Sequence, residues 1–413
     1  MAAQPGGRFA LAFIFLTMAI DTIGLGLIIP VSPGIIRDLT HQTLSGAAHW
    51  AGWLFFVYAL MQFLCAPLIG NLSDRFGRRP VLILSLLMLG VDYAITGLAP
   101  TISWLFIGRT LSGMAGASYP TVNAYIADVS PPEKRAANFG LVGAAFGLGF
   151  ILGPALGGLL GEHFGLRAPF FAAAGLAVAN ALFGFFVLKE SLPPERRRKF
   201  ELWRANPLGT LKALGRYPAL TLLFGVLLFI RLAHDALPST WTYYTMQKFG
   251  WGPGDVALSL VAVGALSAVS FAVLPRVVVP RLGETRAVYV GLAFGAMAYA
   301  GYAFALAPWM LYSWMIVFCL GSVANPALTA ILSHLVPHDE QGELQGAVAS
   351  ITSLTSIVSP LLMTNLFGYF TGGHAPVYFP GASFFAASLF ELCALAIFVL
   401  AAPARRHATE PVT

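Results

Sequence analysis

Long apolar runs, interrupted by short polar segments, dominate the pattern of this chain. Apolar windows of about 20 residues are long enough to cross the hydrocarbon core of a bilayer as helices. Of the 413 residues, 57% are hydrophobic and only 10% are charged. We therefore expect an all-α integral membrane protein with twelve transmembrane helices. The predicted spans are residues 9–31, 48–69, 81–99, 102–126, 138–160, 168–188, 219–240, 256–275, 287–306, 309–332, 344–368 and 381–402.

Lysine and arginine are distributed unevenly over the segments between these spans. With both termini placed in the cytoplasm, most of the 24 Lys and Arg residues fall on the cytoplasmic side. Only Arg37, Arg167 and Lys248 fall on the opposite face. Because positively charged loops stay cytoplasmic, this distribution predicts cytoplasmic termini. The net charge of +6 is then a topology signal, and no nucleic-acid partner is needed to explain it.

The chain contains an internal repeat with a shift of 206 residues. The string "YIADVSPPEKRAANFGLVGA" from Tyr125 aligns with "ILSHLVPHDEQGELQGAVAS" from Ile331. The same shift pairs Pro154 with Pro360. Parallel repeats of this kind are common in transporter folds. We expect two six-helix halves, at 1–188 and 219–413, joined by a cytoplasmic linker at 189–218.

A charged string, "GNLSDRFGRRP" (70–80), separates the second and third spans. We expect it to be a loop that turns at its glycines, with its arginines keeping it on the cytoplasmic side. A topology anchor is one explanation. The carboxylate, which topology does not require, suggests pairing with a helix N-terminus or with an arginine of the neighbouring half. The residues concerned are Gly70, Asp74, Arg75, Gly77, Arg78 and Arg79.

This string resembles the loop motif G-x-L-x-D-R-x-G-R-R of the major facilitator superfamily, and the duplicated layout resembles its fold. The resemblance implies a latch that holds the two halves in the outward-facing state. Asp128, which flanks the fourth span, would support the latch by pairing with Arg78 or Arg79. The second copy of the string has Pro280 at the position of Asp74, so we expect an asymmetric latch.

Two further features lie inside the spans. Arg109 sits in the fourth span, where an arginine costs several kcal/mol unless it is paired or faces water. The string "GLGFILGPALGG" (147–158) predicts a smooth helix face for close packing. It also resembles the motif G-x-x-x-G-P-x-x-G-G that is associated with antiporters. Here the motif is formed by Gly149, Gly153, Pro154, Gly157 and Gly158.

A closer resemblance is carried by "DTIGLGLIIPVSP" (21–33), by residues 70–95 and by "QGELQGAVASITSLTSIVSPLL" (341–362). These strings are similar to the bacterial tetracycline/proton antiporters, in the drug:H+ antiporter branch. That resemblance implies a functional monomer in the bacterial inner membrane that exports a tetracycline–divalent metal complex in exchange for a proton. No cofactor is expected, apart from Mg²⁺ carried with such a substrate.

Ionisable residues inside the spans are candidates for proton coupling because they are costly to place there. Asp21 and Asp92 match acidic positions of the tetracycline exporters; hydrogen-bonded packing is the alternative. Arg231, His234 and Asp235 lie at i, i+3 and i+4, so they share one helical face as either a proton relay or a static salt bridge.

The second half departs from the family pattern at two positions. The tetracycline exporters have an aspartate in span 9 where this chain has Gly295, and a histidine in span 8 near the position of Ser267. Glu391 in the last span, together with the charges of span 7, is a candidate to compensate for these losses. Because the family's coupling and drug contacts partly lie in this half, the substrate stays open.

Several polar and aromatic residues are candidates to line a drug cavity, because such groups suit a ring-rich amphiphile. Two of them, Tyr58 and Trp241, would fit an interfacial belt equally well. The candidates are Tyr58, Gln62, Asn123, Trp241, Tyr243 and Asn325.

Two functions remain after this reading. The first is a proton-coupled exporter of tetracycline-like or other amphiphilic drugs. The second is an exporter of an endogenous metabolite, a siderophore or an organic anion, which Arg109 and Arg231 would favour. A membrane sensor or enzyme is a third class, but the sequence has no metal-ligand spacing, phosphate-binding loop or nucleophile elbow. We therefore expect a transporter and not an enzyme.

Overall fold

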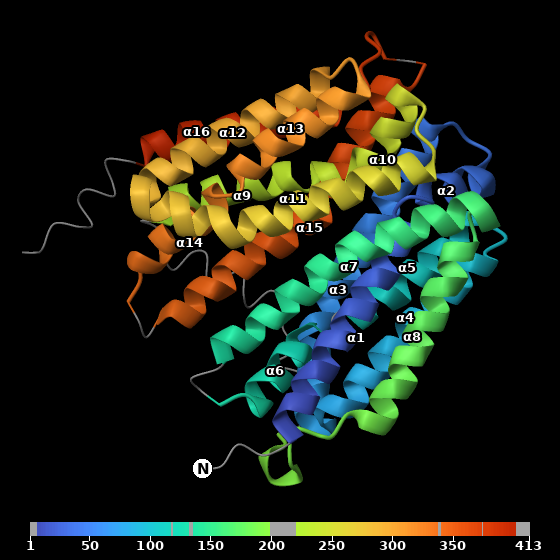
Figure 1. Cartoon of the computed structure of the whole chain (residues 1–413), viewed down its shortest axis with the longest axis vertical. Helices are drawn as coiled ribbons and strands as arrows, with labels where there is room; N and C mark the ends of the chain where they lie inside the picture. Colours follow the sequence, from blue (N-terminus) through green and yellow to red (C-terminus); the bar gives the residue numbers. More distant parts are fainter. Residues whose placement is uncertain are drawn as a thin grey trace, which may run out of the picture. The chain divides into compact units, whose positions relative to one another are not determined.

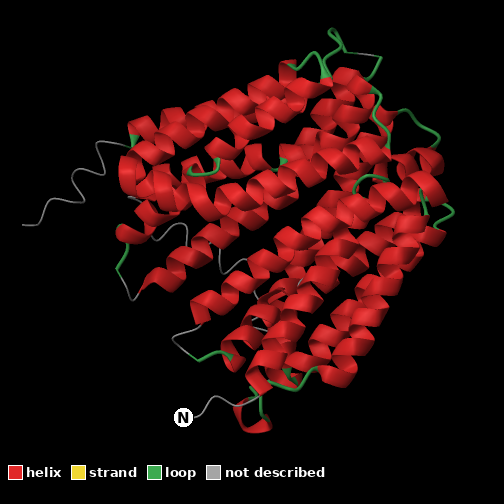
Figure 2. Cartoon of the chain, viewed as in Figure 1, coloured by secondary structure: helices red, strands yellow, loops and turns green. Residues whose placement is uncertain are grey.

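A computed structural model describes residues 6–116, 119–131, 135–198, 220–337, 340–373 and 375–401. Within these residues all regular structure is helical (Figure 2). Helices are expected here because hydrocarbon offers no partners for backbone N–H and C=O groups, which a helix satisfies internally. Most of the predicted linker 189–218 lies outside the described residues, as do the arginines that follow the last helix.

The helices of the first half of the sequence carry the labels α1 to α8 in Figure 1. They are α1 (Gly6–Ile28), α2 (Ser32–Thr40), α3 (Leu44–Phe76), α4 (Arg78–Leu98), α5 (Ile102–Gly116), α6 (Tyr119–Val129), α7 (Arg135–Phe164) and α8 (Ala168–Val187). A short 3-10 turn, η2 (Pro194–Arg196), follows them.

The second half contributes the remaining helices. They are α9 (Thr221–His234), α10 (Ala236–Phe249), α11 (Pro253–Leu282), α12 (Glu284–Phe304), α13 (Pro308–Gly321), α14 (Ala324–His334), α15 (Gln341–Thr371) and α16 (Ala382–Leu400).

The expected membrane-protein fold is confirmed. Every predicted span overlaps a helix or a pair of helices. Ten segments of the described residues are long and apolar enough to cross a membrane, two of them being the joined pairs α9–α10 and α13–α14. A bent pair adds an eleventh: residues 14–28 of α1 and α2 meet at 48°. The predicted first span ran on to residue 31, whereas the helix ends at Ile28, two residues before Pro30.

Span 7 also differs from its prediction. The predicted range 219–240 is interrupted after His234, and a new helix runs from Ala236 to Phe249. The predicted relay residues therefore sit at a helix junction instead of on one continuous helix.

The repeat is visible in the helix boundaries. Helix α12 begins and ends 206 residues after α4. Each of the two helices follows a glycine with positive φ, 103° at Gly77 and 77° at Gly283. This backbone conformation strains any residue with a Cβ, so the same glycine turn occurs twice.

The contacts between residues divide the chain into two compact units. Unit 1 contains residues 1–43, 57–207 and 251–264, and unit 2 contains residues 44–56, 208–250 and 265–413. The units follow the sequence halves except that the first turns of α3 belong to unit 2 and the first turns of α11 belong to unit 1. The boundaries expected from sequence order, at 188 and 219, stay a prediction.

In unit 1, α1 lies alongside α7 (Figure 1). The glycine string of α7 permits the contact: a Cβ on Gly153 would lie 2.6 Å from the Cα of Gly26, and one on Gly157 would overlap the backbone of Leu27. The fourth glycine, Gly158, faces the start of α11 instead. The predicted close packing of this helix face is therefore present.

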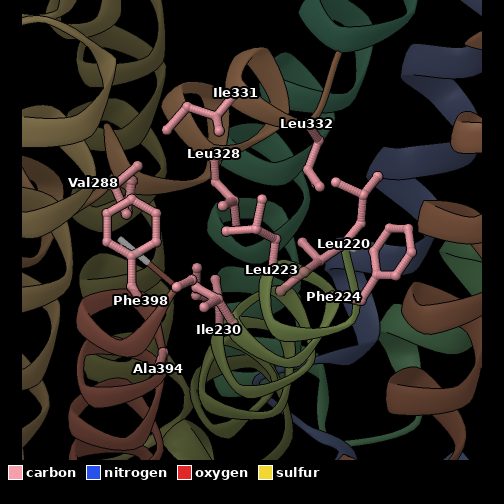
Figure 3. Close-up of a cluster of buried hydrophobic side chains, with 14 of the residues drawn as sticks. Leu220, Leu223, Phe224, Ile230, Val288, Leu328, Ile331, Leu332, Ala394 and Phe398 are labelled. Carbon is pink, nitrogen blue, oxygen red and sulfur yellow. The ribbon is translucent and has the colours of Figure 1, made fainter. Parts of the chain in front are cut away.

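In unit 2, a buried cluster joins α9, α12, α14 and α16 (Figure 3). Leu223 and Ile230 of α9 lie near Leu328 of α14, with Val288 and Phe398 beside them. Four of these five side chains are no more than 2% exposed to solvent, and all are buried. This core fixes α16 against its neighbours.

Candidate functional site

An ion pair lies inside unit 1. Arg109 on α5 donates through Nη2 to Asp92 Oδ2 on α4, at 2.5 Å. Thr96, one turn beyond Asp92, donates to the other carboxylate oxygen at 3.3 Å. Gly108 makes room for this group, because a Cβ there would overlap Asp92 Oδ1. Two of the predicted functional residues thus neutralise each other, and Asp92 is fully buried.

A small cavity of about 40 Å³ borders this pair. Its polar lining includes Asp21 on α1, Tyr58 on α3, Tyr93 on α4 and Arg109 on α5, together with two serines. The volume suits a few water molecules and is far below the roughly 300 Å³ that a drug-sized ligand needs. The cavity therefore suits protons and water.

Asp21 has no ion-pair partner among the described residues. Its Oδ1 and the hydroxyl of Tyr93 are both buried without a hydrogen-bond partner in that part of the chain. The two acids near Arg109 thus differ: Asp92 holds the guanidinium, while Asp21 faces the same cavity unpaired. An unpaired buried carboxylate is costly as an anion, so this arrangement can hold a proton on Asp21.

Two of the predicted cavity residues meet at the end of α5. Gln62 Nε2 donates to Gly116 O at 3.2 Å, and a Cβ on Gly116 would lie 2.8 Å from the hydroxyl of Tyr58. Asn123 lies on α6, half-buried, and is not part of the cavity lining.

Two of the predicted cavity residues of unit 2, Trp241 and Tyr243, have buried side chains in this structure. Trp241 is 1% exposed, and its ring packs edge-on against Tyr302 and Phe384 with centroids 5.3 and 5.9 Å away. Tyr243 is also buried and packs against Phe367. In this structure an aromatic cluster surrounds Trp241, and its role as a cavity-lining residue stays a prediction. Asn325 is half-buried at the start of α14, and its Oδ1 has no partner in the described residues.

The charges of span 7 do not form the static salt bridge considered from the sequence. Asp235 occupies the junction between α9 and α10. No ion pair joins it to Arg231 among the described residues, and Arg231 Nε and Asp235 Oδ2 are buried without hydrogen-bond partners there. His234 is exposed.

Glu391 lies where the sequence comparison found an acid missing. Its carboxylate is packed against the backbone of Gly295: a Cβ on that glycine would lie 3.2 Å from the carboxylate carbon. The acid on α16 therefore fills the space that a side chain on α12 would occupy, a relation that spacing along the sequence could not show.

The charged string between spans 2 and 3 is not the loop that was expected. Helix α3 continues through it to Phe76, and Gly77 alone forms the turn before α4 begins at Arg78. Gly70 lies within the helix, with nothing within 4 Å of an added Cβ. The prediction placed the turn over too many residues because polar residues can extend a helix beyond the apolar span.

Arg78 connects the acidic residues of this region. Its Nη1 lies 2.5 Å from Asp74 Oδ1, and its Nε lies 3.5 Å from Asp128 Oδ2 at the end of α6. Arg75 and Arg79 instead lie over the rings of Phe76 and Phe185. The described ion pairs of Asp74 and Asp128 thus lie within unit 1.

Glu190 is a functional candidate that the sequence analysis missed. Its carboxylate accepts hydrogen bonds from the backbone N–H groups of Arg78 and Arg79, at 2.8 and 3.2 Å. N–H groups in the first turn of a helix have no partner within the helix, and a carboxylate is favoured there. The backbone N–H of Arg198 also donates to the carbonyl of Asp74, at 3.0 Å. The only feature of the sequence that could have indicated this cap was an acidic residue soon after the sixth span.

A helical membrane protein with a duplicated helix order and a charged site inside its spans is typical of membrane transporters. The sequence pattern of the Major Facilitator Superfamily matches residues 14–360. The chain belongs to this superfamily of membrane transporters and is not an enzyme.

The chain is similar to drug-resistance proteins. It is 40% identical to "Tetracycline resistance protein, class C" of Escherichia coli over 358 residues, 87% of this chain and 89% of that protein. It is 32% identical to "Multidrug resistance protein 2" of Bacillus subtilis (strain 168), covering 87% and 88%. A bacterial homolog of the human lysosomal transporter Spinster, solved inward-facing and occupied, covers 100% of both chains with a TM-score of 0.80 and 18% identity, which shows the fold alone.

Proposed function

We propose that this protein is a proton-coupled antiporter that exports tetracycline-like or other amphiphilic drugs by alternating access. The similarity to tetracycline-resistance and multidrug-resistance proteins over most of the chain supports drug export. The observation that supports proton coupling is the small cavity where Asp21, which has no ion-pair partner among the described residues, lies beside an arginine already paired with Asp92.

The mechanism follows from this competition for one cation. With a proton on Asp21, Arg109 has a single carboxylate partner, Asp92. When Asp21 loses its proton, the guanidinium faces two carboxylates across a cavity of about 40 Å³. The two protonation states therefore favour different side-chain arrangements, and a proton can shift a conformational equilibrium only through such differential affinity.

The charged region around Gly77 provides the proposed latch. Asp74, Arg78 and Asp128 would release one another when the helices that carry them move, while Glu190 keeps the start of α4 capped. We place the protein in the bacterial inner membrane as a monomer, with both termini in the cytoplasm. Mg²⁺, if involved, would travel as a chelate of the substrate.

The alternative is an exporter of a metabolite, a siderophore or an organic anion. This alternative requires that Arg109 and Arg231 are cations available to a substrate. The ion pair with Asp92 engages the first of them, so we favour the drug exporter.

The test uses purified protein in proteoliposomes with a pH-sensitive dye and an imposed pH gradient. Tetracycline is added with and without Mg²⁺. We expect proton flux that depends on both and is lost in Asp21→Asn, which cannot exchange a proton. Asp38→Asn, at an exposed residue of α2, is the matched control and should transport normally.

Two results would contradict the proposal. Proton flux that is unchanged in Asp21→Asn would remove this residue from coupling. A dye that stays silent with tetracycline and other drugs, yet responds to organic anions, would support the alternative exporter.

A further inference from the structure

Glu391 is the only charged residue of α16, and it lies in the middle of that helix. Its side chain is buried, at 7% exposed. No hydrogen bond or ion pair reaches its carboxylate from the part of the chain that the structure describes. A Cβ on Gly295 of α12 would lie 3.3 and 3.4 Å from the two carboxylate oxygens.

The contact between α16 and α12 is fixed on both sides of this acid. One turn earlier, Ser388 Oγ donates to the carbonyl of Ala296 at 2.8 Å. One and two turns later, Ala394 and Phe398 are fully buried in the unit 2 core (Figure 3). The backbone of α16 is therefore held against α12 at the position of Glu391.

The titratable groups on the helices packed against α16 leave Glu391 unpaired. Tyr299 of α12 is the nearest in the sequence to Gly295 and is fully buried. The others lie on α9, at the α9–α10 junction, on α10, and near the ends of α12 and α15, and none of those described forms an ion pair with Glu391. They are Arg231, His234, Asp235, Tyr243, Tyr244, Lys248, Glu284, Arg286, Tyr289, Tyr302, Glu343 and Tyr369.

An ionised carboxylate in this position would be a buried charge without compensation, which is strongly unfavourable. A metal would need further ligands, and the described residues contain no group of three or more His, Cys, Asp or Glu side chains that could hold one. The ligand that neutralises a carboxylate in so little space is a proton.

We infer that Glu391, packed over Gly295, is a second proton-binding site in unit 2, separate from the Asp21 cavity and occupied by a proton in the conformation described. Its role in transport rests on the proposed function. If Asp21 and Glu391 each exchange a proton per cycle, two positive charges enter for each substrate that leaves. Export of a singly charged cation would then move net charge inward and respond to the membrane potential as well as to the pH gradient.

The protonation state can be measured without transport. Infrared difference spectra of the full protein in lipid nanodiscs, recorded over a pH titration, detect the C=O stretch of protonated carboxylic acids. We expect a band at neutral pH that disappears in Glu391→Gln and persists in Asp21→Asn. Glu195→Gln, at an exposed residue, is the matched control and should leave the band unchanged.

A second variant tests the geometry. Gly295→Ala places a methyl group 3.2 Å from the carboxylate carbon and should shift the frequency of the band. Gly175→Ala on α8, with nothing within 4 Å of the added Cβ, should not. Absence of a protonated band assignable to Glu391 at neutral pH would overturn the inference, whatever the transport assay shows.

The transport assay then separates the two proposals. Loss of one proton per substrate in Glu391→Gln, with residual proton-driven export, supports two sites. An unchanged proton count in Glu391→Gln overturns the second exchange while leaving Asp21 as the coupling acid. Absence of any proton-driven export by the unaltered protein refutes the proposed function but leaves the infrared result to decide the protonation of Glu391.

Discussion

The two repeats place an ion pair at the same two positions but with opposite charges. In unit 1, Arg78 at the start of α4 pairs with Asp128 at the end of α6. The residues 206 positions further on, Glu284 at the start of α12 and His334 at the end of α14, pair at 3.2 Å in unit 2. The duplicated backbone brings these positions together, whereas the side chains that meet there have diverged.

The same comparison holds inside the membrane. Asp92 and Arg109 correspond to Ala298 and Met315, which are both fully buried and apolar. The unit 1 pair joins a carboxylate to a guanidinium. The buried acid inside the spans of unit 2, Glu391, comes from a different helix and has no ion-pair partner among the described residues. Inside the membrane, the first repeat thus has an ion pair at positions where the second has apolar residues, and the buried acid of the second repeat lies on another helix.

The largest effect should come from breaking the membrane ion pair. Arg109→Gln leaves Asp92, which is fully buried, without its cation. Removing one partner of a buried pair typically costs about 3–5 kcal/mol. We expect a clear drop in the thermal unfolding temperature in detergent. Met315→Leu, at the corresponding position of the second repeat, should cost less than about 1.5 kcal/mol because it conserves volume.

The double variant Asp92→Asn/Arg109→Gln checks the explanation. If the loss arises from an uncompensated charge, the double variant should recover much of the stability lost in Arg109→Gln. A double variant that is as unstable as the sum of the single ones would show that packing of the long arginine side chain, and not its charge, is what matters.

The next comparison concerns a helix crossing that occurs in both repeats. In unit 1, Gly153 of α7 packs directly on Gly26 of α1. The equivalent residues of unit 2 are Ser359 of α15 and Leu232 of α9, and there Ser359 Oγ donates to the carbonyl of Leu232 at 2.8 Å. A backbone contact in one repeat is thus a side-chain hydrogen bond in the other.

This difference predicts that substitutions at the two crossings lower the stability of the protein by unequal amounts. Gly153→Ala puts a Cβ 2.6 Å from the Cα of Gly26, so the helices must separate, and such overpacking costs about 1–3 kcal/mol. Ser359→Ala loses one hydrogen bond, worth roughly 1 kcal/mol. Thermal unfolding of both variants measures the difference. Gly143→Ala, with open space at the added Cβ, is the control for helix propensity. Equal losses for the two variants would contradict the comparison.

The sequence predicted the fold well because apolar length, positive loops and a long repeat are each encoded locally. It also found the members of the charged site, including Asp21, Asp92 and Arg109. It could not show that Arg109 is held by Asp92, since their distance depends on how α4 packs against α5. The sequence analysis missed Glu190 for the same reason, because this residue is 112 positions away from the backbone that it caps. Nor could the sequence show that Trp241, a candidate for a cavity or an interfacial belt, lies in an aromatic cluster.

A smaller effect should follow from the helix cap. The start of α4 depends on Glu190, whereas α12 carries its own acid, Glu284, in its first turn. Glu190→Gln weakens a charge-assisted cap, which is worth about 1 kcal/mol, and should speed hydrogen exchange at the N–H groups of Arg78 and Arg79. Glu195→Gln, at an exposed residue, should leave that exchange unchanged. Identical exchange in both variants would mean that Gly77 and the arginine contacts alone hold this turn.

The smallest effect concerns the reversed pair of unit 2. His334 is 73% exposed on its side chain, so its pair with Glu284 is worth at most about 1 kcal/mol. Glu284→Gln should therefore lower the unfolding temperature only slightly. Asp128→Asn, which breaks the equivalent pair of unit 1, should lower it more, because the Arg78 side chain is only 11% exposed and its pair is less screened by solvent. Thermal unfolding of the two variants measures the difference, and equal losses would show that the different exposure of the two pairs has no consequence for stability.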